Sequence, residues 1–398
     1  MIRNNYKATI FAACVGYTVQ AVVVNFAPLL FLTFRESYGI PISRLTVLIT
    51  VNFVVQFLTD LLSPRFVLRI GYRKGAVLAH LFAAAGLSLM AILPTVMDPF
   101  WGLLLSVCVF AMGGGLLEVL ISPIVEACPT QNKAGFMSLL HSFYCWGVVL
   151  CVGFSTLFFH FVGTDKWMIL SLAWAALPLL NILLFLRVPL YTVEGEEDGH
   201  KPRYRDIFGK KVFWLMMLFM LCAGAAELAV AQWASAFTES ALGVSKTVGD
   251  LVGVCGFAVT MAVARMIYAK IDEKISVKLA MTFCALLCVF GYLLIGLVDN
   301  AVAGLVGCGI CGFAVGIFWP ASLSMATARI RGGGTLLFAL LAVCGDLGCT
   351  LGPTAAGLVS GAFGDDLRIG ILSAVVFPIL ILGGLLLLRF YDAREKSK

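Results

Sequence analysis

The chain alternates between long apolar runs and short segments rich in charged and turn residues. A run of roughly 20 apolar residues is long enough for a helix to cross the hydrocarbon core of a membrane. Twelve runs reach that length, so the pattern predicts twelve transmembrane helices. Their expected limits are 8–34, 44–63, 75–96, 100–126, 134–161, 167–188, 212–237, 247–268, 277–297, 301–327, 335–361 and 369–390.

The longest polar stretch lies between the sixth and the seventh predicted helix. It contains EGEED followed by HKPRYRDIFGKK and predicts a linker on the cytoplasmic side. We therefore expect an amino-terminal six-helix bundle at residues 1–190, a cytoplasmic linker at 191–211 and a carboxy-terminal six-helix bundle at 212–398.

The basic residues follow this topology. With the amino terminus in the cytoplasm, most of the 28 Lys and Arg residues fall in cytoplasmic segments, and few, such as Arg35 and Lys166, fall outside. Positive charge accumulates on the cytoplasmic side of membrane proteins. Both termini are therefore expected in the cytoplasm.

The two halves also share short patterns in the same order. FRES at 34–37 recurs as FTES at 237–240, and RIGYRKGAVLA at 69–79 aligns with KIDEKISVKLA at 270–280. Gly115 precedes Pro123 by the same interval that separates Gly312 from Pro320. These matches predict an all-α membrane protein whose twelve helices form two parallel six-helix pseudo-repeats.

Composition supports the membrane assignment. The chain is 61% hydrophobic and 13% charged, whereas a soluble domain carries about 25% charged residues. The net charge of +6 is explained by the side of the membrane on which basic residues lie, so no nucleic-acid partner is expected. The chain contains no Asn-x-Ser/Thr site, which fits a multi-pass protein of a bacterial inner (plasma) membrane.

No pattern of metal ligands or catalytic nucleophiles occurs, so we expect no metal, no cofactor and no enzyme activity. The thirteen cysteines lie within apolar runs, and Cys308 and Cys311 are interpreted as small packing residues in spite of their CxxC spacing.

Four ionisable residues fall inside predicted helices and are candidates for proton coupling: Glu118, Glu227, Asp346 and His141. A charged group is costly at the centre of a membrane helix and marks a functional site by default. Glu118 lies in GGGLLEVLISP, within a long apolar run that has no other charged residue before Glu126. For His141 a proton relay, substrate binding and a packing role stay open. Asp346 either carries a proton or pairs with a basic residue such as Arg265.

Polar and aromatic side chains within the same helices are candidates for substrate binding. Asn52, Gln56 and Asp60 share one helix face; they line either a water-filled path or a hydrogen-bonded seam between helices. Amide and indole groups suit sugar hydroxyls and apolar sugar faces. The substrate-binding candidates are Gln20, Asn25, Asn52, Gln56, Tyr144, Trp146, Gln232, Trp233 and Trp319.

Four segments carry a resemblance to a known family. SPRFVLRIGYRKG follows the second predicted helix, GGGLLEVLISP lies in the fourth, VARMIYAKI in the eighth and GIFWPASLSMA in the tenth. Together they resemble the fucose–proton symporter type of sugar permease within the major facilitator superfamily. The resemblance covers the whole chain and implies a transporter with a major facilitator fold.

By this resemblance Glu118 couples protonation to sugar binding. A cytoplasmic gate is expected at Asp60, Arg69, Arg73 and Arg265. The family pairs the fourth-helix acid with an aspartate in the first helix, where this sequence offers only Gln20 and Asn25. Proton coupling, sodium coupling and uncoupled transport therefore all stay open.

The leading hypothesis is a monomeric secondary transporter in the lipid bilayer that moves a small polar solute, a sugar or polyol, by alternating access with H+ or Na+. The alternative is an exporter of amphipathic or cationic compounds that exchanges them for protons. A third hypothesis, a membrane sensor that transports nothing, has little support because the linker and tails leave no room for a further domain.

Overall fold

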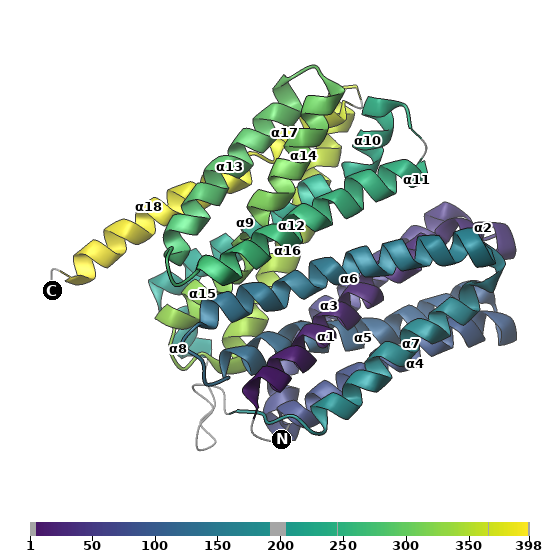
Figure 1. Cartoon of the computed structure of the whole chain (residues 1–398), viewed down its shortest axis with the longest axis horizontal. Helices are drawn as coiled ribbons and strands as arrows, with labels where there is room; N and C mark the ends of the chain where they lie inside the picture. Colours follow the sequence, from purple (N-terminus) through teal and green to yellow (C-terminus); the bar gives the residue numbers. More distant parts are fainter. Residues whose placement is uncertain (1–4, 192–203, 245, 365, 397–398) are drawn as a thin grey trace. The chain divides into compact units, whose positions relative to one another are not determined.

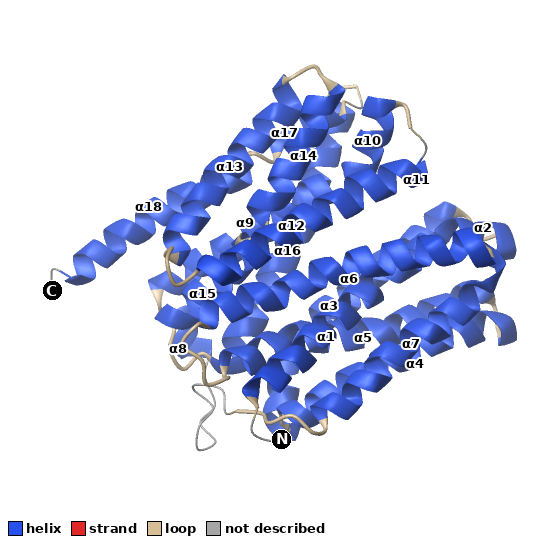
Figure 2. Ribbon diagram, in the orientation of Figure 1, coloured by secondary structure: helices blue, strands red, loops and turns tan. Residues whose placement is uncertain are grey.

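A computed structural model describes residues 5–191, 204–244, 246–364 and 366–396. These residues form helices and connecting loops, with no strand among them (Figure 2). Within the described ranges, twelve helical segments are long and apolar enough to cross a membrane. The predicted number of membrane-spanning segments is confirmed. Most of the predicted linker, residues 192–203, lies outside the described residues.

The helices group into two compact units, Met1–Thr130 with Phe143–Lys201 and Gln131–Ser142 with Pro202–Lys398. The first unit contains α1 (Tyr6–Leu29), α2 (Phe31–Tyr38), α3 (Ile42–Ile70), α4 (Tyr72–Val96), α5 (Pro99–Glu126), most of α6 (Lys133–Val162), η2 (Thr164–Lys166) and α7 (Trp167–Phe185).

The second unit begins with the first residues of α6 and continues after the linker (Figure 1). Its helices are α8 (Tyr204–Phe208), α9 (Lys211–Ala231), α10 (Ala234–Leu242), α11 (Lys246–Gly249), the π-helical η4 (Asp250–Cys255), α12 (Gly256–Ile271), α13 (Val277–Leu297), α14 (Ala301–Val315), α15 (Phe318–Arg329), α16 (Gly334–Ala362), α17 (Leu367–Ser373) and α18 (Val376–Lys396).

Four of the predicted apolar runs each contain two consecutive helices. The run 8–34 divides into α1 and α2, 212–237 into α9 and α10, 301–327 into α14 and α15, and 369–390 into α17 and α18. Proline explains two of the breaks, because it has no N–H and leaves the carbonyl four residues earlier without its helical donor. Pro320 follows the α14–α15 break and Pro378 the α17–α18 break. The predicted membrane spans are confirmed at these places. Hydropathy alone does not show where a helix within a span is interrupted.

Glycine allows close packing between α5 and its neighbours. A Cβ atom at Gly113 would lie 2.6 Å from Ala79 O of α4, and one at Gly115 would lie 2.9 Å from Gln56 O of α3. In the second unit, a Cβ atom at Gly312 of α14 would lie 2.8 Å from Phe257 O of α12. The two units therefore use a glycine at matching sequence positions for the same kind of helix contact.

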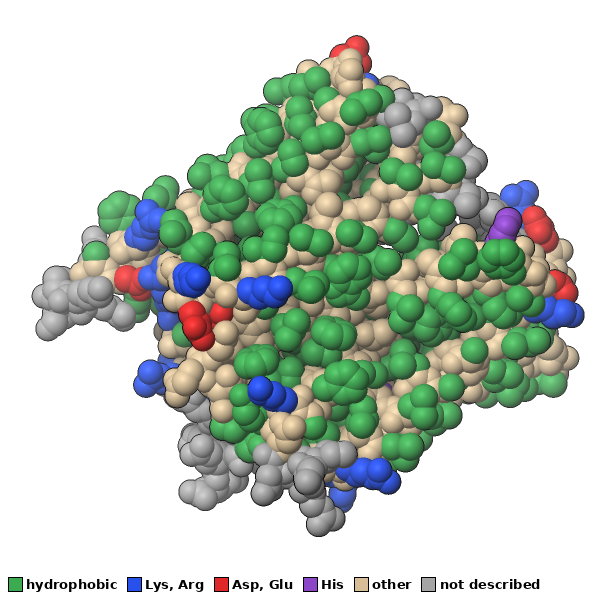
Figure 3. Space-filling view, viewed as in Figure 1, with side chains coloured by type: hydrophobic (Ala, Val, Ile, Leu, Met, Phe, Trp, Pro, Cys, Tyr) green, Lys and Arg blue, Asp and Glu red, His purple; other side chains and the backbone are tan. Residues whose placement is uncertain are grey.

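On the face drawn in Figure 3, apolar side chains are spread over most of the surface, and charged side chains lie mostly toward its edges. On α13 the exposed face carries Phe283, Leu286 and Phe290, whereas Cys284 and Cys288 of the same helix are buried. Such an outer face is suited to hydrocarbon and unsuited to water.

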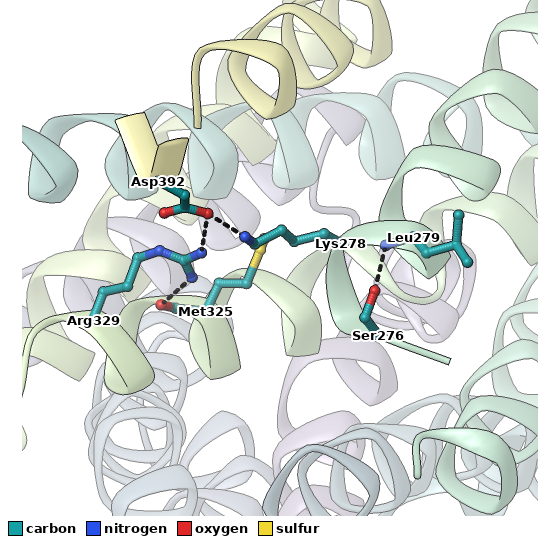
Figure 4. Close-up of polar contacts among 6 residues, drawn as sticks. All are labelled: Ser276, Lys278, Leu279, Met325, Arg329 and Asp392. Atoms are coloured by element: carbon teal, nitrogen blue, oxygen red, sulfur yellow. Dashed lines mark hydrogen bonds and ion pairs between the residues drawn. The ribbon is translucent and has the colours of Figure 1, made fainter. Parts of the chain in front are cut away.

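The last turns of α18 are fixed to α13 and α15 by an ionic cluster (Figure 4). Asp392 pairs with Lys278 of α13, and its Oδ2 also lies 3.4 Å from Arg329 Nη2 of α15. Arg329 in addition donates a hydrogen bond to Met325 O. This cluster is partly exposed and serves to hold the end of α18.

A buried polar group joins α1, α4 and α7 inside the first unit. His80 Nδ1 lies 2.7 Å from Ala76 O, and Asn181 Nδ2 lies 2.7 Å from His80 Nε2 and 3.0 Å from Ala12 O. His80 is fully buried and packs inside the first unit. A carbonyl only accepts, so His80 Nδ1 carries the proton and Nε2 accepts from Asn181.

Candidate functional site

Polar side chains of α1, α3 and α5 meet in the interior of the first unit. Gln20 Nε2 of α1 donates a hydrogen bond of 2.7 Å to Glu118 Oε2 of α5. Gln20 is buried and Glu118 is half-buried. The hydrogen bond gives the carboxylate a directed donor from another helix, and donors of this kind stabilise its ionised form.

The face of α3 that carries Gln56 and Asp60 packs against the glycines of α5. Gln56 Oε1 would be 3.1 Å from a Cβ atom at Gly114, and Asp60 Oδ1 would be 2.9 Å from one at Gly115. Asp60 is fully buried, and one of its carboxylate oxygens lies within 4.8 Å of one of Glu118. Asp60 therefore lies beside Glu118, in the middle of α3.

Asn52 and Asn25 lie on the same helices. Asn52 is 6% exposed, and its Oδ1 has no hydrogen-bond partner among the described residues. Asn25 is half-buried and donates from Nδ2 to Ala21 O of its own helix. On α6, Tyr144 is half-buried and Trp146 is 37% exposed.

Arg265 organises the interior of the second unit. Its Nη2 lies 3.6 Å from Glu227 Oε2 of α9, and both side chains are largely buried, with 3% and 14% exposure. Its Nε donates to Gly316 O over 2.7 Å and its Nη1 to His141 O over 2.8 Å. Gly316 O is the carbonyl that Pro320 leaves without a helical donor, so the arginine replaces the missing N–H.

The first turns of α6 are tied to α12 in the same unit. Ser138 Oγ donates to Arg265 O over 2.8 Å, and the Gly135 N–H donates to Asp272 Oδ2 over 2.7 Å. His141 is 4% exposed, and it is its backbone carbonyl that binds Arg265.

The aromatic candidates of the second unit lie against α16. Trp233 Nε1 donates to Pro353 O over 3.1 Å, and its ring approaches Gly357. The Trp319 ring approaches Gly345, the residue before Asp346, which is half-buried. Gln232 is exposed at the α9–α10 break.

The two predicted gate arginines of the first unit differ in their surroundings. Arg73 is half-buried and donates to the backbone carbonyls of Phe185 and Val188 at the end of α7. Arg69 is exposed in the last turn of α3.

Two polar contacts near these residues could not be predicted from the sequence. Tyr17 Oη of α1 and Ser122 Oγ of α5 lie 2.9 Å apart, one turn from the Gln20–Glu118 bond. Ser138 was not singled out because a lone serine in a helix gives no signal about its partner. The close approach of Asp60 to Glu118 had one signal in the sequence, the run of three glycines just before Glu118.

Comparisons with known proteins agree on the architecture. The model of the Major Facilitator Superfamily matches residues 9–353. The structure of the E. coli fucose:proton symporter FucP covers 96% of this chain and 98% of its own, with 15% sequence identity and a TM-score of 0.82. No curated protein sequence matches the chain.

Two further structures show the same fold. The proton:xylose symporter XylE, bound to 6-bromo-6-deoxy-D-glucose, aligns at 12% identity over 96% of this chain and 94% of its own, with a TM-score of 0.81. The human organic anion transporter MFSD10 aligns at 16% identity over 96% of this chain and 100% of its own, with a TM-score of 0.73. At these identities the similarity establishes the fold and leaves the solute open.

Proposed function

Since the chain belongs to the Major Facilitator Superfamily and is a multi-pass membrane transporter, we propose that it moves a sugar or polyol across the membrane by alternating access, with Glu118 as the proton-coupling carboxyl group. The observation that carries this proposal is the hydrogen bond from Gln20 to Glu118 within otherwise apolar helices. A carboxylate in that setting is costly and is retained where it binds an ion or a solute.

The polar groups around Glu118 favour a solute rich in hydroxyl groups. Gln20 and Gln56 are both buried, and each has one amide atom without a hydrogen-bond partner among the described residues. Hydroxyl groups both donate and accept, so a sugar or polyol can satisfy such amides. FucP and XylE, the symporters with similar structures, are named for sugars and for protons.

The second buried acid is less suited to carry the proton. Glu227 already has a positive partner in Arg265, which is 3% exposed. No Lys or Arg is buried among the described residues of the first unit, where Glu118 lies. Arg265 fixes the Glu227 carboxylate in an ion pair, whereas Glu118 binds the neutral amide of Gln20, so we take Glu118 as the candidate for reversible protonation.

The second candidate function is export of amphipathic or cationic compounds. Trp146 is 37% exposed and Trp319 is half-buried, so aromatic surface is available for an apolar solute. A ligand stabilises the state that it binds. Protection of the purified protein from thermal unfolding by lipophilic cations, without protection by sugars, would favour this function.

Uptake into proteoliposomes tests the sugar proposal. With a panel of labelled sugars and polyols, at least one is expected to accumulate above its external concentration only when the interior is alkaline. Glu118→Gln is expected to lower this accumulation at least tenfold and to leave counterflow exchange in place, because the variant can still bind solute but cannot exchange a proton.

Glu126→Gln is the matched control, since it makes the same chemical change at the end of the same helix. Concentrative, pH-driven uptake that persists in Glu118→Gln would contradict the assigned role.

A further inference from the structure

Two carboxyl groups lie close together inside the first unit. An oxygen of Asp60 and one of Glu118 are within 4.8 Å of each other, and Asp60 is fully buried. They come this close because Gly115 has no side chain; a Cβ atom there would lie 2.9 Å from Asp60 Oδ1. Two carboxylates that share a site disfavour each other's ionisation, and one of them then binds a proton readily.

Two buried amide side chains beside the carboxyl pair have atoms that are available to bind a proton-carrying group or a solute. Gln20 is 5% exposed; its Nε2 binds Glu118, and its Oε1 has no hydrogen-bond partner among the described residues. Gln56 is 3% exposed, and its Nε2 is likewise without a partner there. Buried polar atoms in native proteins are normally satisfied, so the unit contains hydrogen-bonding capacity that a protonated carboxyl group or a solute would use.

The amide atom that faces Glu118 favours a proton over a metal cation as the ion bound here. Sodium-like hard cations are surrounded by oxygen ligands. Here the Gln20 amide presents its N–H to Glu118, and an N–H donor repels a cation while it stabilises a carboxylate.

Three other ionisable side chains of α1 and α4 have partners away from the carboxyl pair. Tyr17 of α1 contacts Ser122, His80 of α4 contacts Asn181, and Arg73 of α4 binds carbonyls of α7. The remaining charged side chains of α1, α3, α4 and α5 lie near helix ends: Lys7, Arg44, Arg65, Arg69, Lys74 and Glu126.

We propose that Asp60 and Glu118 together form one binding site for a single exchangeable proton, with Asp60 as the second carboxyl group of the coupling site. This inference rests on the proposed function in taking the proton as the coupling ion. One O–H bond forms at a carboxylate oxygen when the site loads from water on one side. The same bond breaks when the proton leaves to water on the other side. Gln20 holds the Glu118 carboxylate in place throughout.

Infrared titration of the purified protein tests the pair without any solute. The signal of protonated carboxyl groups is followed as the pH is raised across the neutral range. In the wild type, loss of one proton per molecule is expected. In Asp60→Asn the midpoint of this loss should move to lower pH by about one unit or more, because Glu118 has then lost the negatively charged neighbour on α3.

Two further variants keep the test decisive. Asp60→Glu retains a carboxyl group and should titrate nearly as the wild type does, while Glu126→Gln should change nothing. Gel filtration confirms that each variant is folded before it is titrated. An unchanged midpoint in Asp60→Asn overturns the proposal, as does a wild-type midpoint that shifts when sodium replaces potassium in the buffer.

The titration tests the carboxyl pair and the uptake measurement tests the proposed function, so one proposal can be wrong while the other stands. If the paired titration is observed but no sugar or polyol accumulates with a pH gradient, the carboxyl pair stands and the proposed solute class is wrong. If accumulation depends on Glu118 but Asp60→Asn titrates as the wild type, the function stands and Asp60 has no part in it.

Discussion

The buried side chain of Arg265 binds groups on three other segments of the chain. Its guanidinium group binds the Glu227 carboxylate and the carbonyls of Gly316 and His141. A planar group with five N–H donors is suited to this arrangement in a way that lysine is not. The sequence suggested a gate role for Arg265 and showed Pro320 within the tenth predicted helix. It could not indicate that Arg265 binds the carbonyl of Gly316, because the two residues lie on different segments of the chain.

Removing the partner of this arginine should be costly. Glu227→Met leaves Arg265 buried without a counter-charge, and loss of one member of a buried ion pair costs about 3–5 kcal/mol. Equilibrium unfolding in mixed micelles should show this loss, and Glu227→Met combined with Arg265→Met should recover part of it. The control is Asp299→Asn, which removes an ion pair with Arg368 whose acid is 95% exposed and should cost less than about 1 kcal/mol. A single variant as stable as the wild type would show that the pair contributes nothing.

Asp60 marks the limit of what the sequence predicts about single residues. Its place toward the end of the predicted helix 44–63 suggested a gate, and α3 continues beyond that limit to Ile70. The gate assignment stays a prediction. Glu118, by contrast, could be singled out from sequence because its cost in an apolar helix does not depend on neighbours.

Among the helices, α4 and α5 are held close by glycine, and two neighbouring glycines should respond differently to substitution. A Cβ atom at Gly113 meets the α4 backbone, 2.6 Å from Ala79 O, whereas one at Gly114 meets the flexible end of Gln56 at 3.1 Å. Gly113→Ala should therefore destabilise the protein by about 1–3 kcal/mol, and Gly114→Ala by much less.

Thermal unfolding of the purified variants measures this difference. Gly153→Ala is the control, because nothing lies within 4 Å of its added Cβ atom. Equal unfolding midpoints for Gly113→Ala and Gly114→Ala would mean that the helices adjust freely, contrary to a backbone contact.

For the whole molecule, hydropathy and length were sufficient to predict the twelve membrane-spanning segments, because a bilayer demands an apolar run of fixed minimum length. The pseudo-repeat could be predicted in part, from glycine and proline at matching intervals. The contacts of Gly115 with α3 and of Gly312 with α12 give that match a physical cause. Partners across helices could not be predicted, since sequence separation contains no information about which faces meet.

The side of the membrane on which each loop lies is still a prediction, and epitope tags test it. A tag inserted after Met97 should bind antibody on intact spheroplasts, whereas a tag after Thr130 should bind only after permeabilisation, because basic residues cluster in cytoplasmic loops. A tag at the carboxyl terminus should behave like the one after Thr130. The reverse pattern would place both termini outside.

The hydrogen bonds of His80 make it a spectroscopic reporter inside the first unit. With Nδ1 donating to Ala76 and Nε2 accepting from Asn181, the ring is held as the less common neutral tautomer, whose two nitrogens give distinct nuclear resonance signals. Asn181 also binds Ala12 of α1, the helix that carries Gln20. Nitrogen-15 labelling of histidine would thus place a probe where α1, α4 and α7 join, and a shift of its signals during turnover would report rearrangement inside the first unit.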